Sequence, residues 1–177
     1  EVNDMVYTVS PGEYSNIIPS KDGLILLELS SDTIYTLLPN NNLTSIIVRN
    51  PPIQNTEPQF FMILRLISDR YYFMETIKNV YDFNTKDGFP RSFMMYDEQE
   101  KAMFNYTVYN GDFSIKKVIY MDMIRLVNHE IGYWYPLEAY QLLKSFEKGE
   151  LKGKLKEIAS TLDEDSNPII MLIKHKK

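Results

Sequence analysis

Few residues of this sequence have the types and spacing that catalysis needs. The chain contains two histidines, His129 and His175, and no cysteine. His129 precedes Glu130 in a stretch expected to form a turn, where the two could act as a general base and its carboxylate partner. An exposed turn histidine is the simpler interpretation, and His175 lies in a lysine-rich segment where water should solvate it. We therefore predict no catalytic residue and no cofactor.

Metal ligands are equally sparse in the sequence. The segment 163–167 (DEDSN) carries acidic residues at alternate positions, as the start of a calcium-binding loop does. Such a loop requires Gly at its sixth position and Glu at its twelfth. Here those positions hold Pro168 and Lys174. We therefore interpret the segment as a polar loop that leads into a strand, and we predict no metal site.

Aromatic clusters are the best candidates for binding. The chain has 13 Tyr, 9 Phe and 1 Trp. Rings with acidic or amide neighbours suit sugars and peptides, because they cover apolar ring faces while the polar groups bind hydroxyls or amides. Two clusters, 71–73 and 106–109, are explained at least as well by packing inside a sheet. The third lies where a strand is expected to meet a helix, and it predicts a binding site formed by Glu130, Tyr133, Trp134 and Tyr135.

Composition limits the class of protein. The 177 residues are 44% hydrophobic and 24% charged, which is typical of one globular domain and excludes intrinsic disorder. No apolar run approaches the ~18 residues that a membrane-spanning helix needs. The formal net charge of −5 argues against a nucleic-acid partner, whose binding surface should be basic.

Short apolar stretches separated by turn residues dominate the first 130 positions. They predict three repeating units of antiparallel strands, over residues 6–50, 59–110 and 117–177. The strands expected in the first unit are Val6–Ser10, Leu24–Leu29, Thr33–Leu38 and Leu43–Arg49. Those expected afterwards are Gln59–Ile67, Arg70–Ile77, Arg91–Tyr96, Ala102–Tyr109, Lys117–Leu126 and Glu130–Trp134. A meander that recurs every ~40–50 residues is typical of propeller blades.

The apolar period changes from 2 to 3.6 near Pro136, which predicts two helices. The first, over 136–147, begins with Pro136 in its first turn, presents Leu137, Tyr140, Leu143 and Phe146 on one face, and ends at Gly149. The second, over 150–162, should bury Leu151, Leu155, Ile158, Ala159 and Leu162. The near-continuous apolar run Pro168–Ile173 then predicts a last strand in the centre of the final sheet.

Several stretches resemble the C-terminal half of six-bladed β-propeller proteins of gut Bacteroidetes. They include SSDTIYTLLPN (30–40), LISDRYYFMETIKNVYDF (66–83), GFPRSFMMYDEQEKAMFNYTVYN (88–110) and, most specifically, KGELKGKLKEIASTLDEDSNPIIMLIKHK (148–176). The resemblance implies an exported protein, periplasmic or anchored to the outer membrane, although the chain begins with EVNDMVYTV and shows no leader. It also implies that this single domain is the C-terminal part of a longer propeller.

Together these observations predict an all-β fold, a partial β-propeller of antiparallel meander blades with two C-terminal helices packed on the last blade. The leading hypothesis for function is a non-catalytic binding or scaffolding module of the cell envelope, with a glycan or a peptide as ligand. One alternative is a propeller hydrolase or lactonase whose central metal site is completed by missing blades. Another is a purely structural protein. Expected partners are the missing N-terminal blades or, for the isolated chain, a second copy.

Overall fold

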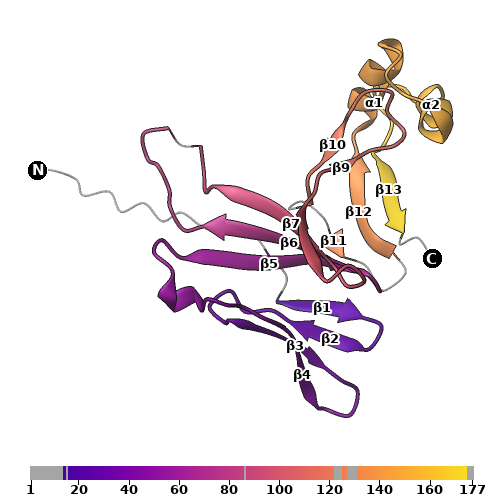
Figure 1. Ribbon diagram of the computed structural model, residues 1–177. Helices are drawn as coiled ribbons and strands as arrows, with labels where there is room; N and C mark the ends of the chain where they lie inside the picture. Colours follow the sequence, from indigo (N-terminus) through magenta and orange to yellow (C-terminus); the bar gives the residue numbers. More distant parts are fainter. Residues whose placement is uncertain (1–13, 15, 86, 122–124, 127–130, 175–177) are drawn as a thin grey trace, which may run out of the picture.

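The computed structural model describes residues 14, 16–85, 87–121, 125–126 and 131–174, so the expected strand Val6–Ser10 lies outside the described residues. Within them the chain folds into antiparallel sheets with short helices near the C-terminus (Figure 1), and the predicted all-β class is confirmed. The first sheet has the order β1-β2-β3-β4 and consists of Ile17–Ser20, Gly23–Leu26, Thr33–Leu37 and Leu43–Val48.

The second sheet repeats this arrangement with longer strands. Its order is β5-β6-β7-β8, and its strands are Phe60–Ile67, Tyr71–Lys78, Arg91–Asp97 and Ala102–Asn105. A short 3-10 helix, Ile53–Asn55, lies between the two sheets in sequence. Each strand pairs with the next along the chain, so both sheets are meanders joined by local turns. Two four-stranded meanders therefore follow each other along the chain, and β1 is a strand that the sequence analysis did not predict.

The third unit is divided more finely than expected. β9 (Val108–Tyr109) and β10 (Val118–Ile119) form a two-stranded sheet, and β11 (Arg125–Leu126), β12 (Ile131–Leu137) and β13 (Ile169–Lys174) form a three-stranded one. The expected strand Ala102–Tyr109 is therefore split between two sheets, and so is Lys117–Leu126. The chain returns after its helices to pair β13 with β12, as the sequence indicated.

Four predicted details near the C-terminus differ in the structure. Pro136 lies in β12 opposite Ile170, and the helix α1 runs over Ala139–Glu147 rather than from Pro136. Tyr140 is exposed, because the buried face of α1 is formed by Ala139 and Leu142. Among the described strands, β13 is at the edge of its sheet rather than in the centre. α2 is short, spanning Gly153–Ala159.

Apolar clusters pack the successive sheets against one another. The cluster between the first and second sheets contains Ile18, Ile25, Ile34, Ile63, Leu64 and Met74. A smaller cluster joins Leu66 and Phe73 of the second sheet to residues of the third unit, including Met121, Tyr135 and Ile173. The helices are packed by a third cluster, in which Leu142, Leu151, Leu155 and Ala159 surround Phe113, with Leu137 and Ile169 of the last sheet beside them. The helices therefore rest on the last sheet, as predicted.

Candidate binding pocket

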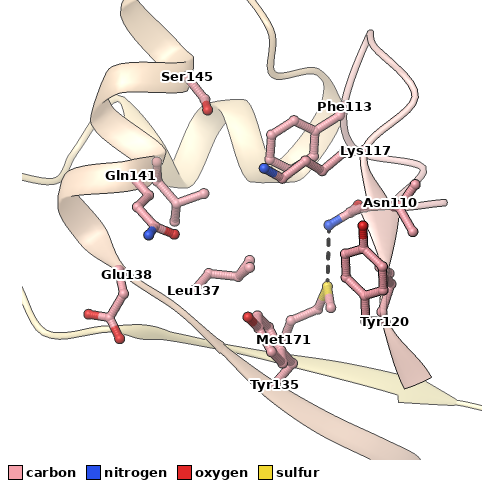
Figure 2. Close-up of a pocket in the computed structure, with 13 residues that line it drawn as sticks. Asn110, Phe113, Lys117, Tyr120, Tyr135, Leu137, Glu138, Gln141, Ser145 and Met171 are labelled. Carbon is pink, nitrogen blue, oxygen red and sulfur yellow. Dashed lines mark hydrogen bonds between the residues drawn. The ribbon is translucent and has the colours of Figure 1, made fainter. Parts of the chain in front are cut away.

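A cavity of about 400 Å³ lies between the β9–β10 sheet, the β12–β13 pair and the first turns of α1 (Figure 2). This volume is within the range typical of pockets for small ligands. The loop between β9 and β10, residues 110–117, contributes Asn110, Phe113 and Lys117 to the lining of the cavity. The middle of this loop is held by the segment that precedes α2. Phe113 forms an isolated bridge with Leu151, and the backbone N–H of Lys152 donates to the carbonyl of Asp112 at 2.8 Å.

Asn110 is the most firmly held polar residue of the cavity. Its side chain is buried, with the residue 8% exposed. Its Oδ1 accepts from the backbone N–H of Asp112 at 2.9 Å, and its backbone N–H donates to the carbonyl of Lys117 at 2.8 Å. One N–H of its Nδ2 is directed at the sulfur of Met171, 3.4 Å away (Figure 2). Because an amide nitrogen carries two protons, Asn110 has a second N–H to offer a ligand from a fixed position.

The wall of the cavity is largely apolar. It consists of Phe113, Val118, Ile119, Leu137, Leu142 and Met171, together with the ring of the half-buried Tyr135. Phe113 and Leu142 also belong to the cluster that packs the helices. The apolar wall is therefore continuous with the core and should keep its shape when a ligand enters.

Polar and charged groups lie around this wall. Glu138 precedes α1 as its N-cap but makes no side-chain capping hydrogen bond, and Figure 2 shows its carboxylate at one side of the cavity. Gln141 follows one turn later on the same helix, and its Nε2 donates to the hydroxyl of Tyr140 at 3.0 Å. Lys117 stands on the opposite side, with its Nζ 6.0 Å from the centre of the Phe113 ring. The cavity thus offers one cationic group, one anionic group and two amides to a ligand.

Tyr120 adds an aromatic ring that is open to solvent. It is 59% exposed and lines the cavity directly after β10. Tyr135 approaches the same space from β12 (Figure 2). Two tyrosine rings from separate segments, with amides and a carboxylate near them, are the combination that suits stacking on the apolar face of a sugar ring.

Among the four residues that the sequence proposed, Tyr135 is the one that the structure places in the cavity. Trp134 is opposite Leu172 in the strand pair, so the alternation of β12 puts it on the other face of the sheet. The backbone of Tyr133 pairs with Leu126 and Ile173, and its side chain and Glu130 lie outside the described residues. Sequence reasoning missed Asn110, Tyr120, Glu138 and Gln141, which come from three segments with no shared motif.

The structure also bears on the metal site, the histidines and the 163–167 loop that the sequence analysis considered. Across the described ranges, no group of three or more His, Cys, Asp or Glu side chains is arranged to hold a metal. His129 and His175 lie outside those ranges. In the 163–167 loop the hydroxyl of Ser166 donates to Asp163 Oδ1 at 2.6 Å and accepts from the backbone N–H of Asp163 at 3.0 Å. No helix in the described part of the chain has the length and apolarity that crossing a bilayer would require.

A scan against protein-family models and a search of the curated proteins found no match to this chain. Among solved structures it is similar to the crystal structure of a Bacteroides fragilis protein described as a "putative exported protein". The TM-score is 0.55, the sequences are 15% identical, and the match covers 96% of this chain and 51% of that one. The likeness shows a shared fold over nearly all of this chain, which spans about half the length of the protein it matches.

Proposed function

We propose that this chain is a binding module of the bacterial cell envelope and that the cavity beside α1 binds a short glycan. The observation that carries the proposal is the composition of the cavity. An apolar wall with two tyrosine rings, Tyr120 and Tyr135, is combined with the fixed amide of Asn110 and the carboxylate of Glu138. Such a site can bind through ring stacking and hydroxyl hydrogen bonds.

The proposed position in the cell envelope, as an exported protein, has two lines of support. The structural match bears the description of an exported protein, and stretches of the sequence resemble exported proteins of gut Bacteroidetes. The proposed architecture is part of a β-propeller. Two successive four-stranded meanders stacked through their apolar faces support it, and so does the smaller unit that follows them.

A glycan array probed with the purified chain, followed by calorimetry on the best oligosaccharide, tests the proposal. Tyr120→Ala should weaken binding by about two- to tenfold, since loss of one stacked ring costs about 0.5–1.5 kcal/mol. Gln141→Ala and Glu138→Gln should weaken it as well. Phe83→Ala is the matched control, because Phe83 is an aromatic residue of similar exposure, 57%, that does not line the cavity.

Two results would count against the proposal. If the array shows binding that Tyr120→Ala and Gln141→Ala leave unchanged, the ligand binds elsewhere. If no glycan binds and a peptide array gives hits that Tyr120→Ala abolishes, the cavity is a binding site of a different class.

A further inference from the structure

The buried amide of Asn110 directs its N–H donors into the cavity. The residue is 8% exposed, and its Oδ1 accepts from the backbone N–H of Asp112 at 2.9 Å. This contact fixes the orientation of the amide, because a flipped amide would place its NH2 group against that N–H. The partner of Nδ2 among the described residues is the thioether sulfur of Met171, at 3.4 Å. Since sulfur is a weak acceptor, Nδ2 keeps the capacity for a stronger hydrogen bond with a ligand.

The surroundings of this amide restrict the ligand group that can bind it. The backbone N–H of Phe113 donates to the carbonyl of Asn110 at 3.4 Å, and Val118 is paired with Tyr109, the residue before Asn110. Phe113, Val118 and Met171 all line the cavity. A sugar hydroxyl could accept from Nδ2 here, but it would bring a proton of its own into apolar surroundings, where an unpaired donor costs free energy. A carbonyl oxygen brings no proton, and a methyl group attached to the carbonyl would contact the apolar wall.

The opposite side of the cavity complements the remaining half of such a group. In a trans amide the C=O and the N–H point in opposite directions. A ligand carbonyl directed at Asn110 therefore directs the ligand N–H across the cavity, to the side where Figure 2 shows Glu138 and Gln141. Both side chains carry an oxygen that can accept, and Glu138 makes no side-chain capping hydrogen bond with α1. The cavity thus offers a donor and an acceptor on the two sides that one secondary amide requires.

We propose that the glycan bound in this cavity contains an N-acetylated amino sugar, whose acetamido group lies between Asn110 and the side formed by Glu138 and Gln141. This inference rests on the proposed function and adds the substituent that the site selects. Tyr120 and Tyr135 line the same cavity and are the rings that contact the sugar itself. Asn110 is then the residue that distinguishes an acetamido group from a hydroxyl.

Two matched pairs of sugars test the inference on the 177-residue chain without any substitution. N-acetylglucosamine is compared with glucose, and N-acetylgalactosamine with galactose, by NMR titration. The members of a pair differ only in the group at their second carbon. In at least one pair the acetylated sugar should bind about tenfold more tightly or better, because it adds a hydrogen bond to Asn110 and a buried methyl group. Equal affinities within both pairs would overturn the inference, as would no binding of either acetylated sugar by a chain that binds other glycans on the array.

Asn110→Asp tests the assigned contact. The substitution keeps the shape of the side chain and the oxygen that accepts from Asp112, but it replaces the donor with an acceptor. The preference should therefore reverse, since a carboxylate accepts from the hydroxyl of the parent sugar and repels the acetamido carbonyl. Tyr120→Ala is the comparison variant, which should weaken both members of a pair alike and leave their ratio unchanged. If Asn110→Asp keeps the melting temperature and the preference of the wild type, the acetamido group binds elsewhere and the inference is wrong. If Asn110→Asp does not fold, the matched pairs still decide.

Failure of this inference can be told apart from failure of the proposed function. If the wild type binds parent and acetylated sugars equally and Tyr120→Ala weakens both, the cavity binds glycans and the acetamido assignment alone is wrong. If no glycan on the array binds, the proposed function fails and this inference fails with it.

Discussion

Arg65 and Glu75 form a buried ion pair between neighbouring strands of the second sheet. Glu75 is fully buried in β6, and its Oε2 accepts hydrogen bonds from Nε and Nη2 of Arg65 at 2.8 and 2.6 Å. Its other oxygen accepts from Nη1 of Arg91, on β7, at 2.5 Å. One carboxylate therefore binds two guanidinium groups and ties the three longest strands of the sheet together. Removing one member of such a group leaves the others charged and without compensation.

We expect Glu75→Gln to lower the free energy of unfolding by about 3–5 kcal/mol, the cost typical of breaking a buried ion pair. Urea denaturation measures the change. Glu98→Gln is the control, because Glu98 pairs with Lys101 at 3.0 Å on the surface and such pairs contribute about 0–1 kcal/mol. Similar losses for the two variants would mean that the buried group contributes no more than a surface pair.

A second arginine pair should control stability in acid. Arg70 donates to both oxygens of Asp97, at 2.9 Å from Nε to Oδ1 and 2.6 Å from Nη2 to Oδ2. These bonds, aided by the backbone N–H groups of Gln99 and Glu100, lower the pKa of Asp97 from 3.8 to about 2, against the opposing effect of its burial. Since the folded pKa lies below the unfolded one, the stabilisation is complete above about pH 4 and is lost as the pH falls through 2.

The pH prediction has two measurements. The carboxyl carbon of Asp97 should titrate near pH 2 in an NMR experiment, and Arg70→Gln should raise that pKa. The difference in melting temperature between the wild type and Asp97→Asn should be constant above about pH 4 and should shrink toward pH 2. A wild-type Asp97 that titrates near 3.8 would show that Arg70 does not hold it in solution.

Local patterns were sufficient to predict most strands, because turn chemistry and alternation are properties of neighbouring residues. The turn at Lys21 and Asp22 connects β1 to β2, and Gly149, with a φ of 68°, ends α1 as predicted. The split of Ala102–Tyr109 could not be predicted, because its first part pairs back with β7, where Asn105 is opposite Met94, while its second part pairs forward with β10, where Val108 is opposite Ile119. Both pairings are local, and alternation along a strand does not show where the chain leaves one sheet for the next.

Pro136 and the last strand show how tertiary context overrides local pattern. β11 is described only opposite Tyr133 and Trp134, so β13 is the one described neighbour of β12 at Pro136. Proline lacks an N–H and is tolerated in a strand where the ladder does not need that donor. The continuous apolar run of β13 indicated a strand covered on both faces. In the described structure one face is packed and the other, with Ile170 and Leu172, is open.

The cavity was only partly predictable from the sequence. Tyr135 belonged to a visible aromatic cluster, whereas Asn110 and Gln141 are ordinary residues that packing brings together from a loop and a helix. Trp134 was in the same cluster, but the alternation of a strand separates it from Tyr135. The sequence analysis ended the strand at Trp134 and expected a helix from Pro136. It therefore assigned the rings of Trp134 and Tyr135 to one surface, whereas β12 continues to Leu137 and places them on opposite faces.

Packing of the second helix on the last sheet makes a direct prediction. Leu155 is 6% exposed and lies among Phe113, Leu142 and Ala159. Leu155→Ala should therefore lower the free energy of unfolding by about 2–5 kcal/mol, as other deletions of buried leucine side chains do. Lys154→Ala, at the exposed position just before Leu155 in α2, should change it by less than about 0.5 kcal/mol. A loss as small for Leu155→Ala would show that α2 is not packed against the sheet in solution.

Gly23 makes the sharpest prediction about the first sheet. It begins β2 with a φ of 153°, and a Cβ built on it would lie 2.1 Å from the carbonyl oxygen of Leu37. That oxygen cannot move aside easily, because Leu37 is held in β3 between Leu24 and Leu43. Gly23→Ala should therefore destabilise the protein by more than about 1 kcal/mol, in contrast to the gain of about 0.4–1 kcal/mol that Gly→Ala gives where the backbone allows it.

Gly111→Ala is the matched control, since no atom lies within 4 Å of the position its Cβ would take. Thermal unfolding of the two variants separates the cases, and an unchanged midpoint for Gly23→Ala would mean that β2 and β3 are farther apart at this turn than the structure places them.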